Sequence, residues 1–380
     1  MRVVVISGRM PAASGKGDQL RGFQFARALA AEHEVEVITT GAGKKVAGAQ
    51  EQIASFATLR VLQTPLAGRT AGAIGALLRG QPAQVGWMMP GYRWRFVKRR
   101  AAEADLVLAM SVRSLRGRLP VPVILDHVDA FSLNMRRRAT GPEPAPVRWL
   151  ARMEAALLVR WERRLSGWVA AQLVTSPIDA RELPAQPPMH VVGNSVELSE
   201  TSDRPPGERD IDVILTGNMA YPPNADAAAW LSEAIAPAIW RRRPQTAVWV
   251  VGRDAARLTL DERIQVRADV PEIAEYVRRA HLAVAPLRIG TGTPNKVLEA
   301  MAVGTAVVAT PAAVEAFGFP AGSVVEADTA DAIATEICRL LEDPGARELV
   351  VQRAGAVVAD YGEAAQRDQL AAIVSAALAS

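Results

Sequence analysis

The sequence predicts an α/β protein made of two doubly wound domains. The chain has 380 residues, more than a single hydrophobic core usually fills. Short apolar runs alternate with longer helical patterns, as in parallel sheets with crossover helices. This alternation restarts after a polar, proline-rich stretch at 199–209. We therefore expect an N-terminal domain at 1–200, a C-terminal domain at 201–360, and a C-terminal helix at 361–380 that can cross back to the first domain.

The expected elements follow one another in a regular order in each half. In the first half we expect strands at 3–7, 35–39, 106–110, 121–125 and 173–176, and helices at 19–31, 93–102 and 147–165. In the second half we expect strands at 213–215, 247–251, 282–285 and 306–309, and helices at 224–240, 272–280 and 295–302. Parallel sheets bind ligands at the carboxyl ends of their strands, so we expect a ligand cleft where the two domains face each other.

The composition is that of an ordinary globular protein, with 49% apolar and 22% charged residues. Its single cysteine, Cys338, excludes an internal disulfide, and no Cys/His cluster has the spacing of a zinc site. We therefore expect no metal site. No apolar run approaches the roughly 20 residues of a membrane-spanning helix, and the amino-terminal run is too short for a secretory signal. These features favour a cytoplasmic protein, either free or on a membrane surface.

Charge is distributed unevenly between the two halves. Residues 1–200 contain 27 Lys and Arg against 16 Asp and Glu, a net charge of +11. Residues 201–380 contain 17 against 24, a net charge of −7. The basic half could meet a phosphate-bearing substrate or an anionic membrane. We expect no nucleic-acid partner, because no recognition motif accompanies the charge.

The segment at 282–310 reads LAVAPLRIGTGTPNKVLEAMAVGTAVVAT and predicts an anion site. A buried strand leads to a loop with two glycines, and Thr293 is the expected N-cap of the next helix. The free N–H groups at a helix start attract anions, and Lys296 adds a full charge there. Glu299 follows on the same helical face, where a carboxylate can accept hydrogen bonds from ribose hydroxyls. The alternative is a tight turn with a Lys296–Glu299 surface pair.

These residues resemble the donor-binding region of family 4 glycosyltransferases, which have the GT-B fold of two Rossmann-like domains across a central cleft. The resemblance rests on NKVLEAM at 295–301, EAMAVG at 299–304 and AVVAT at 306–310. It extends to TGNM at 216–219, YPPN at 221–224, VVG at 250–252, DVP at 269–271, and Pro11 with GKGDQLRG at 15–22. The matches occur in the family's order over nearly the whole chain.

The resemblance implies a retaining, metal-independent transferase that moves a sugar from a nucleotide-diphosphate sugar to an acceptor hydroxyl. A uridine, guanosine or adenosine donor is compatible, and glycan, lipid-linked and small-molecule acceptors remain open. It implies catalytic roles for Lys296, Glu299 and His127. It also implies donor contacts from Gly217, Asn218, Asn224, Gly252, Arg253, Val270, Gly290, Thr291, Gly292, Thr293 and Asn295.

The sequence departs from the family pattern at two places. Thr291 stands where most members carry a Glu that contacts the transferred sugar, so backbone amides could replace that contact. Ala225 and Asp226 stand where many members carry Arg and Lys to hold the diphosphate. Lys296 is the expected replacement, with help from Arg253 or Arg288.

Two polar segments of the first half are candidate substrate contacts. The SGKGD stretch at 14–18 lacks the spacing and the final Ser or Thr of a P-loop. It is either a plain connection or a loop in which Gly15, Lys16, Gly17 and Asp18 approach substrate. LDHVDAFS at 125–132 follows a buried strand, so Asp126 and Asp129 either position the acceptor or cap the next helix, and His127 could contact the donor sugar.

Two helical patterns combine charges with aromatic residues. The 153–164 pattern places Glu154 and Glu162 on one stripe, which we interpret as a solvated face. RWRFVKRR at 93–100 is either a basic face for an anionic membrane or a solvent-facing helix with two buried aromatics. The remaining tryptophans are expected to pack between helices and sheets: Trp149, Trp161, Trp168, Trp230, Trp240 and Trp249.

Two other functions remain open at this point. A non-catalytic nucleotide-sugar sensor would explain the missing carboxylate at Thr291. A sugar-nucleotide epimerase would need acid and base groups, for which Asp126 and Asp129 are candidates. Only a transferase requires an acceptor for turnover, so acceptor dependence separates the three.

Overall fold

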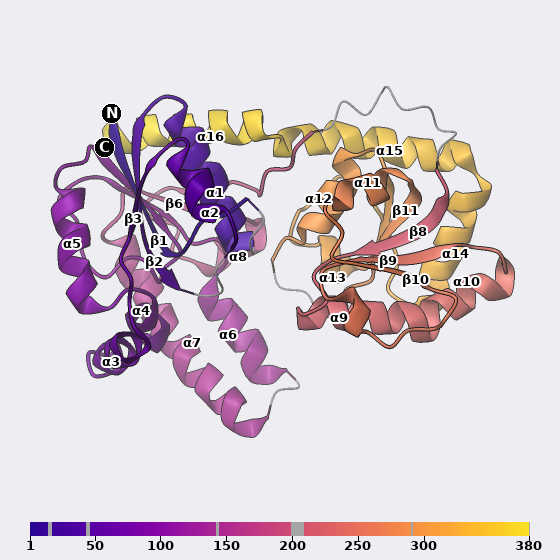
Figure 1. Cartoon of the computed structure of the whole chain (residues 1–380), viewed down its shortest axis with the longest axis horizontal. Helices are drawn as coiled ribbons and strands as arrows, with labels where there is room; N and C mark the ends of the chain where they lie inside the picture. Colours follow the sequence, from indigo (N-terminus) through magenta and orange to yellow (C-terminus); the bar gives the residue numbers. More distant parts are fainter. Residues whose placement is uncertain (14–16, 43–45, 142–143, 199–208, 290–291, 380) are drawn as a thin grey trace. The chain divides into compact units, whose positions relative to one another are not determined.

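The computed structural model describes residues 1–13, 17–42, 46–141, 144–198, 209–289 and 292–379, and it forms two α/β units (Figure 1). The N-terminal unit contains Met1–Asn194 and Gln366–Ser380, and the C-terminal unit contains Ser195–Ala365. The predicted α/β class with two doubly wound domains is therefore confirmed. The chain passes between units at 194/195 and 365/366, whereas the sequence-based boundaries are at 200 and 360, because the polar stretch begins only after the chain has left the first sheet.

A seven-stranded parallel sheet forms the centre of the N-terminal unit. Its order is β3-β2-β1-β4-β5-β6-β7, so the direction of strand addition reverses at β1 and β4. In this reversal Val3 of β1 lies between Val35 of β2 and Leu106 of β4. The strands are β1 (Arg2–Arg9), β2 (Glu34–Ala42), β3 (Thr58–Val61), β4 (Leu106–Met110), β5 (Val123–Asp126), β6 (Ala171–Val174) and β7 (Met189–Val191).

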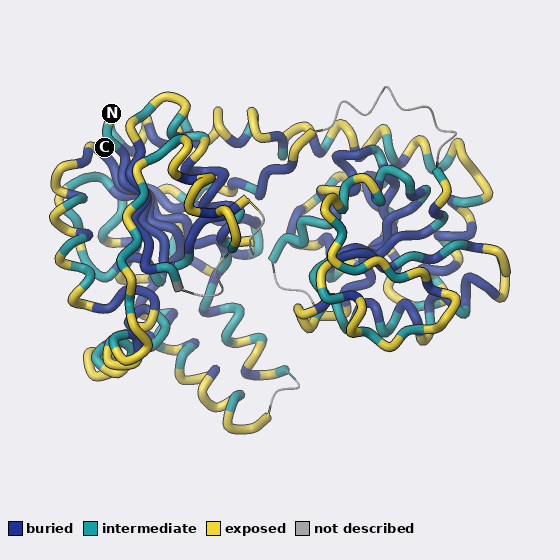
Figure 2. Tube along the Cα trace, viewed as in Figure 1, coloured by how far each residue is buried: buried dark blue, intermediate teal, exposed yellow. Residues whose placement is uncertain are grey.

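Both faces of this sheet are buried, which explains why its strands are nearly continuous apolar runs (Figure 2). Val3 and Val5 pack in a cluster with Phe25 and Leu370, while Val4 and Ile6 pack in a second cluster that contains Val97, Leu158 and Trp161. The covering helices are α1 (Gly17–Ala30), α2 (Ala49–Ala54), α3 (Leu66–Leu77), α4 (Ala83–Met88), α5 (Gly91–Ala101), α6 (Phe131–Thr140), α7 (Ala145–Ser166), α8 (Pro177–Glu182) and α16 (Glu363–Ala379).

The C-terminal unit repeats this plan with a six-stranded parallel sheet. Its order is β10-β9-β8-β11-β12-β13, and the reversal lies between β8 and β11. The strands are β8 (Ile211–Thr216), β9 (Val248–Gly252), β10 (Gln265–Ala268), β11 (Ala280–Ala285), β12 (Ala306–Ala309) and β13 (Val325–Glu326). The helices are α9 (Pro222–Trp230), α10 (Ala236–Arg242), α11 (Ile273–Arg278), α12 (Asn295–Ala302), α13 (Pro311–Val314), α14 (Ala330–Glu342) and α15 (Pro344–Val358).

The last helix, α16, returns to the N-terminal unit. Its buried residues Leu370, Ile373, Val374 and Ala377 belong to the same hydrophobic cluster as β1 and α1. Gln366 at its start donates a hydrogen bond from Nε2 to the Gly193 carbonyl, 2.8 Å away. Burying such side chains contributes roughly 1.5–3 kcal/mol each for the larger ones, so α16 is an integral part of the first unit.

The single helix expected at 224–240 is instead three consecutive segments. α9 is followed by a π-helical turn at Leu231–Ile235 and then by α10. Pro237 lies in the first turn of α10, where its ring removes a backbone donor and disfavours a regular preceding turn. The periodic apolar pattern predicted the existence and length of the helix but not this interruption.

Candidate functional site

The loops after β8 and β9 meet closely at the carboxyl edge of the C-terminal sheet. Gly217 has φ +153° and Gly252 has φ +145°, a region that residues with side chains rarely adopt. A Cβ placed on Gly252 would lie 2.0 Å from the Gly217 carbonyl oxygen. Glycine is thus required at both positions, because it lets the two loops and the side chains of Asn224 and Lys296 approach one another closely.

Lys296 projects into this edge from the first turn of α12. Its Nζ donates a hydrogen bond to Asn224 Oδ1 at 2.8 Å, and Asn224 Nδ2 donates to the Asn218 carbonyl at 3.0 Å. A Cβ on Gly217 would lie 3.1 Å from Lys296 Nζ. Four of the residues expected to bind the donor therefore come together at the point where the strand order reverses: Gly217, Asn218, Asn224 and Lys296.

The ammonium group of Lys296 is the main charge of this edge. Burial lowers its pKa to about 8, and the nearby Glu299 carboxylate opposes the change. Burial also raises the pKa of Glu299, with the Lys296 charge acting in the other direction. The Glu299 side chain is nevertheless exposed, whereas Lys296 is half-buried. A cation beside a glycine turn and a carboxylate one turn deeper suit a diphosphate and a ribose.

The loops after β9 and β10 extend this edge. The Met219 N–H donates to the Arg253 carbonyl at 2.8 Å, and the Asp269 N–H donates to the Gly252 carbonyl at 3.1 Å. Arg253 is exposed next to the glycine turn, and Val270 is half-buried after the end of β10. Both lie in the loops at which the sequence places the donor contacts.

Arg288 has a different role from the one considered for it. Its guanidinium forms a bidentate ion pair with Asp226, with an Nε–Oδ2 distance of 3.0 Å, and lies over the Trp230 ring at 5.2 Å. Asp226 is one of the two residues that depart from the family pattern. Arg288 is thus paired with Asp226. Arg253 is therefore the better second cation for a phosphate.

The start of α12 differs by one residue from the prediction. Pro294 is the N-cap, without a side-chain capping bond, and Asn295 is the first helical residue, so Thr293 is not the cap. Gly292 has φ +79°, which explains the second glycine of the loop. Gly290 and Thr291 lie outside the described residues.

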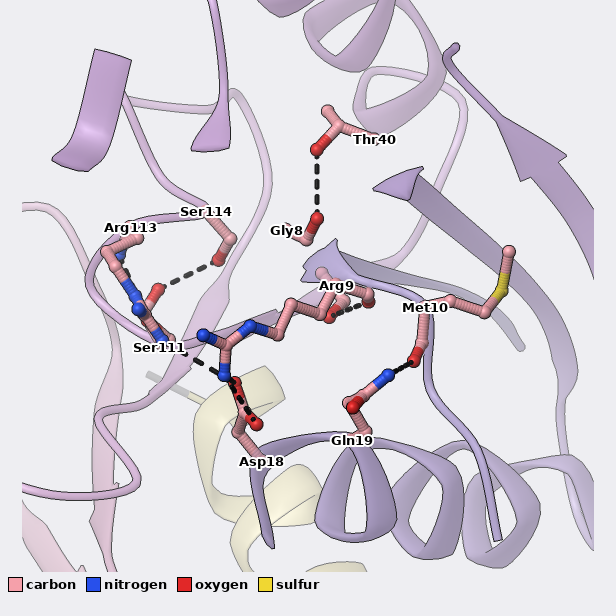
Figure 3. Close-up of polar contacts among 10 residues, drawn as sticks. Gly8, Arg9, Met10, Asp18, Gln19, Thr40, Ser111, Arg113 and Ser114 are labelled. Carbon is pink, nitrogen blue, oxygen red and sulfur yellow. Dashed lines mark hydrogen bonds and ion pairs between the residues drawn. The ribbon is translucent and has the colours of Figure 1, made fainter. Parts of the chain in front are cut away.

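At the carboxyl edge of the N-terminal sheet, a charged cluster surrounds the end of β1 (Figure 3). Arg9 Nη1 donates to both carboxylate oxygens of Asp18, at 2.9 and 2.7 Å. Arg113 Nη2 is 3.5 Å from Asp18 Oδ2, and Arg113 Nε donates to Ser111 Oγ at 3.0 Å. These groups face a small pocket of about 10 Å³, room for about one water molecule, lined by Ser7, Gly8, Arg9, Asp18, Met88, Met110, Ser111, Arg113 and Val128.

Arg113 makes this edge of the sheet suitable for an anion. Its side chain is 12% exposed, and burial lowers its pKa to about 10 while the Asp18 charge opposes the change. The guanidinium also lies 4.2 Å from the centre of the Phe131 ring. Arg9 and Arg113 share the Asp18 carboxylate, and the Asp129 carboxyl group also acts on Arg113, so the net charge of this edge depends on the protonation of Asp129. Sequence reasoning named Asp18 but missed both arginines, although Arg113 follows the strand at 106–110 closely enough for the strand-edge rule to find it.

Asp126 and His127 are both fully buried in contacts with other side chains of the N-terminal unit, which corrects the expectation that they contact substrate. Asp126 is 0% exposed and pairs with Arg21, which donates from Nε to Oδ2 at 2.6 Å and from Nη2 to Oδ1 at 3.2 Å. His127 is fully buried with its Nε2 3.0 Å from Gln172 Oε1, and burial lowers its pKa to about 4. The edge rule gives the end of the strand but not the side to which each residue turns.

Asp129 is the remaining acidic candidate of this segment. It is half-buried and accepts a hydrogen bond from Thr175 Oγ1 at 3.3 Å. Burial raises its pKa to about 6, and the neighbouring Asp179 carboxylate adds to the rise. The N–H groups at the start of α6 are bound by other carboxylates: Asp179 Oδ1 accepts the Ala130 N–H at 2.8 Å, and Glu162 accepts the Ser132 N–H. Asp129 is therefore a titratable group that could contact an acceptor near neutral pH.

In the loop at 14–18, Gly15 and Lys16 lie outside the described residues. Gly17 is the first residue of α1, and a Cβ at this position would meet no other atom within 4 Å. Asp18 lies in the first turn of α1 and is engaged with Arg9. Of the described residues of this loop, Gly17 and Asp18, only Asp18 lines the pocket.

The charged stripe of α7 is not a solvated face, contrary to our interpretation. Glu162 is buried, and its carboxylate accepts the Ser132 N–H at 3.0 Å. Glu154 accepts the Ala83 and Gln84 N–H groups at 3.3 and 3.2 Å and so caps α4. Each carboxylate thus binds free N–H groups at the start of another helix, Glu162 at α6 and Glu154 at α4.

The aromatic residues of α5 and α7 differ from one another in burial. On α5, Trp94 and Phe96 pack against the core, which supports the solvent-facing alternative for its basic residues. Trp149 is the exception among the tryptophans expected to pack inside, because it is 61% exposed at the start of α7.

Comparison with known proteins agrees with this geometry. Residues 210–343 match the family described as "Glycosyl transferases group 1". No curated protein matches the chain. No helix in the described part of the chain is long and apolar enough to cross a membrane.

Solved glycosyltransferases share the fold over nearly the full length. Anabaena Alr3699/HepE in complex with UDP-glucose has a TM-score of 0.68 at 14% identity and covers 99% of both chains. WaaG, a glycosyltransferase involved in lipopolysaccharide biosynthesis, has a TM-score of 0.66 at 14% identity, covering 98% of this chain and 99% of its own. Sucrose-phosphate synthase from Thermosynechococcus elongatus has a TM-score of 0.66 at 16% identity, covering 99% and 98%. At these identities the likeness establishes the fold.

Two conclusions follow from these comparisons. The chain has the GT-B fold that the sequence predicted. The expected enzyme class, a glycosyltransferase, is confirmed, since residues 210–343 match the glycosyl transferases group 1 family.

Proposed function

We propose that the protein is a retaining glycosyltransferase of the family 4 type, which binds a nucleotide-diphosphate sugar on its C-terminal unit. The observation that carries this proposal is the cluster of Lys296, Asn224 and Gly217 at the reversal point of a doubly wound sheet. Such points bind nucleotides in other proteins. The Lys296 ammonium group, 2.8 Å from an amide oxygen and beside the Gly217 turn, suits the charge of a diphosphate.

In the proposed reaction, the bond between the anomeric carbon and the diphosphate oxygen breaks, and the nucleotide diphosphate leaves with the electron pair. The acceptor oxygen forms its bond to the same face of the sugar and loses its proton to an oxygen of the leaving phosphate. Negative charge grows on that phosphate as the first bond weakens, so Lys296 stabilises the transition state more than the ground state. Glu299 would hold the ribose. No metal and no additional cofactor take part in this scheme.

For the acceptor we propose contact with the charged residues around the end of β1, since the pocket itself has room for only about one water molecule. The guanidinium groups of Arg9 and Arg113 and the hydroxyl of Ser111 suit a polar or anionic acceptor. Asp129 would contact the acceptor near the hydroxyl group that reacts. His127 and Asp126, which are fully buried, have no part in this proposal.

The structural neighbours support a uridine donor, because the Anabaena protein was solved with UDP-glucose and with UDP. We therefore propose UDP-sugars as the first donors to test, with GDP- and ADP-sugars beside them. We also propose a cytoplasmic location with peripheral attachment to an anionic membrane.

The test is acceptor-dependent release of nucleotide diphosphate from each donor, with glycan, lipid-linked and small-molecule acceptors. Retention is read from the anomeric configuration of the product by NMR. Release with acceptor, abolished by Lys296→Met and unaffected by Lys98→Met at an exposed lysine of α5, is the expected result. Isomerised donor without acceptor would indicate an epimerase, and tight binding without turnover would indicate a sensor.

A further inference from the structure

The N-terminal unit exposes large hydrophobic side chains on one group of helices. They come from α3 with its C-cap, from α4, from the start of α5 and from the start of α7, and they are exposed in Figure 2 along α3 and at the start of α7. We call this set the apolar face; it consists of Leu66, Ile74, Leu77, Leu78, Trp87, Tyr92, Trp149, Leu150 and Met153. Contiguous exposed apolar surface of this kind usually marks an interaction site.

These helices are held together at one end of the unit (Figure 1). Arg69 of α3 donates from Nη1 to the Trp87 carbonyl of α4 at 3.2 Å. The Glu154 carboxylate of α7 accepts the Ala83 N–H at the start of α4. α5 begins three residues after the end of α4. The exposed residues of α3, α4, α5 and α7 therefore belong to neighbouring elements rather than to separate places on the surface.

In the described parts of the helices that carry the apolar face, basic side chains outnumber acidic ones. Residues 52–102, which include α3, α4 and α5, contain seven Arg and one Lys but no Asp or Glu. On α7, Arg148 and Arg152 are exposed on either side of Trp149 and Leu150. The acidic residue next to them, Glu154, is bound to the start of α4. The partner must therefore be anionic and must accept aliphatic and aromatic side chains together.

This combination selects one class of partner. Nucleic acid would use the arginines but offers little to exposed leucines. A second copy of the same face would bring two sets of positive charges together. An anionic bilayer accepts leucine and methionine among its acyl chains, tryptophan and tyrosine at its interface, and arginine beside its phosphates.

We propose that the apolar face docks the N-terminal unit on the surface of an anionic lipid bilayer. Trp149, Leu150 and Met153 at the start of α7 and Leu77 and Leu78 at the end of α3 enter the interface, while Arg148 and Arg152 contact lipid phosphates. The docking surface does not include Trp94 and Phe96 of α5, because both side chains pack against the protein core.

The test is co-sedimentation of the full chain with vesicles of phosphatidylcholine alone or with 30% phosphatidylglycerol. We expect binding to the anionic vesicles only, weakened by salt because exposed charges are screened. Trp149→Ser/Leu150→Ser should weaken binding by at least tenfold. Arg148→Gln/Arg152→Gln should weaken it about 25-fold, since each charge near the surface is worth about fivefold.

Matched controls come from the C-terminal unit. Leu349→Ser removes an exposed leucine of α15, and Arg241→Gln removes an exposed arginine of α10. Both should bind vesicles as the unchanged protein does. Absence of binding to anionic vesicles, or equal losses in variants and controls, would overturn the proposal. So would self-association in sedimentation velocity that the Trp149→Ser/Leu150→Ser change abolishes.

This inference is independent of the donor site. Vesicle binding is measured without nucleotide, and nucleotide binding is measured without vesicles. The docking variants should keep the melting temperature and the nucleotide affinity of the unchanged protein. A failure of docking and a failure of the proposed transferase function are thus observed in different experiments.

Discussion

The charge of Lys296 should make nucleotide-diphosphate binding depend on pH. With a pKa of about 8, the ammonium form is about nine-tenths populated at pH 7 and about one-tenth at pH 9. A lysine with a lowered pKa loses its charge as the pH rises through that value. If only the charged form holds the diphosphate, the dissociation constant should stay nearly flat below pH 8 and increase about tenfold between pH 7 and pH 9.

Replacing the side chain should have its full effect below pH 8 and a smaller effect above it, where Lys296 has already lost its charge. A hydrogen bond to a charged group contributes about 1.5–3 kcal/mol, so Lys296→Met should raise the dissociation constant about 10- to 150-fold at pH 7. The same change should abolish the pH dependence above pH 7. Lys98→Met, at an exposed lysine of α5, controls for loss of a lysine elsewhere.

Isothermal titration calorimetry with UDP, GDP and ADP from pH 7 to pH 9.5 measures both quantities. The range begins at pH 7 because the second phosphate pKa, about 6, would otherwise contribute. Equal affinities and equal pH profiles for the unchanged protein and Lys296→Met would refute the role of this ammonium group.

Three further predictions concern the sheet edges. Arg21→Met leaves the Asp126 carboxylate buried without its partner, which should cost about 3–5 kcal/mol and lower the melting temperature by about 6–20 °C in circular dichroism; an unchanged melting temperature would contradict the burial of the pair. Gly252→Ala should abolish nucleotide binding in calorimetry, whereas Gly355→Ala in α15, where a Cβ meets nothing within 4 Å, should not; equal affinities would contradict the close approach. Acceptor-dependent turnover should fall below pH 6 as Asp129 is protonated, and Asp129→Asn should remove this acidic limb; persistence of the limb would assign it to another group.

Much of the fold could be predicted because buried parallel strands have a strong sequence pattern. The strands at 106–110 and 306–309 and the helix at 295–302 agree with the structure at both ends. In each, an apolar run or an amphipathic turn is bounded by a clear break. β3 and β7 were missed since they are short edge strands, one with alternating and one with mixed exposure. α3 and α4 were missed because their small and exposed apolar residues lack a regular period.

The sequence predicted some residues of the candidate sites and missed others. Lys296 is 72 positions from Asn224, and the rule that ligands bind at strand ends, together with the family resemblance, predicts that they meet. The fully buried Arg21–Asp126 pair was not predicted, because its partners are 105 positions apart and belong to no local pattern. The exposure of Trp149 was not predicted either, since a tryptophan in an amphipathic helix packs inside in most globular proteins.

The most direct test of the central claim is thermal stabilisation by UDP, GDP and ADP of the unchanged protein and of Lys296→Met. A ligand at 100 times its dissociation constant stabilises a native protein by about 2.7 kcal/mol, enough to raise the melting temperature by several degrees. We predict that one diphosphate stabilises the unchanged protein and that the same concentration has little effect on the variant. If none of the three stabilises the unchanged protein, the C-terminal unit does not bind a nucleotide donor at this edge and the account is contradicted.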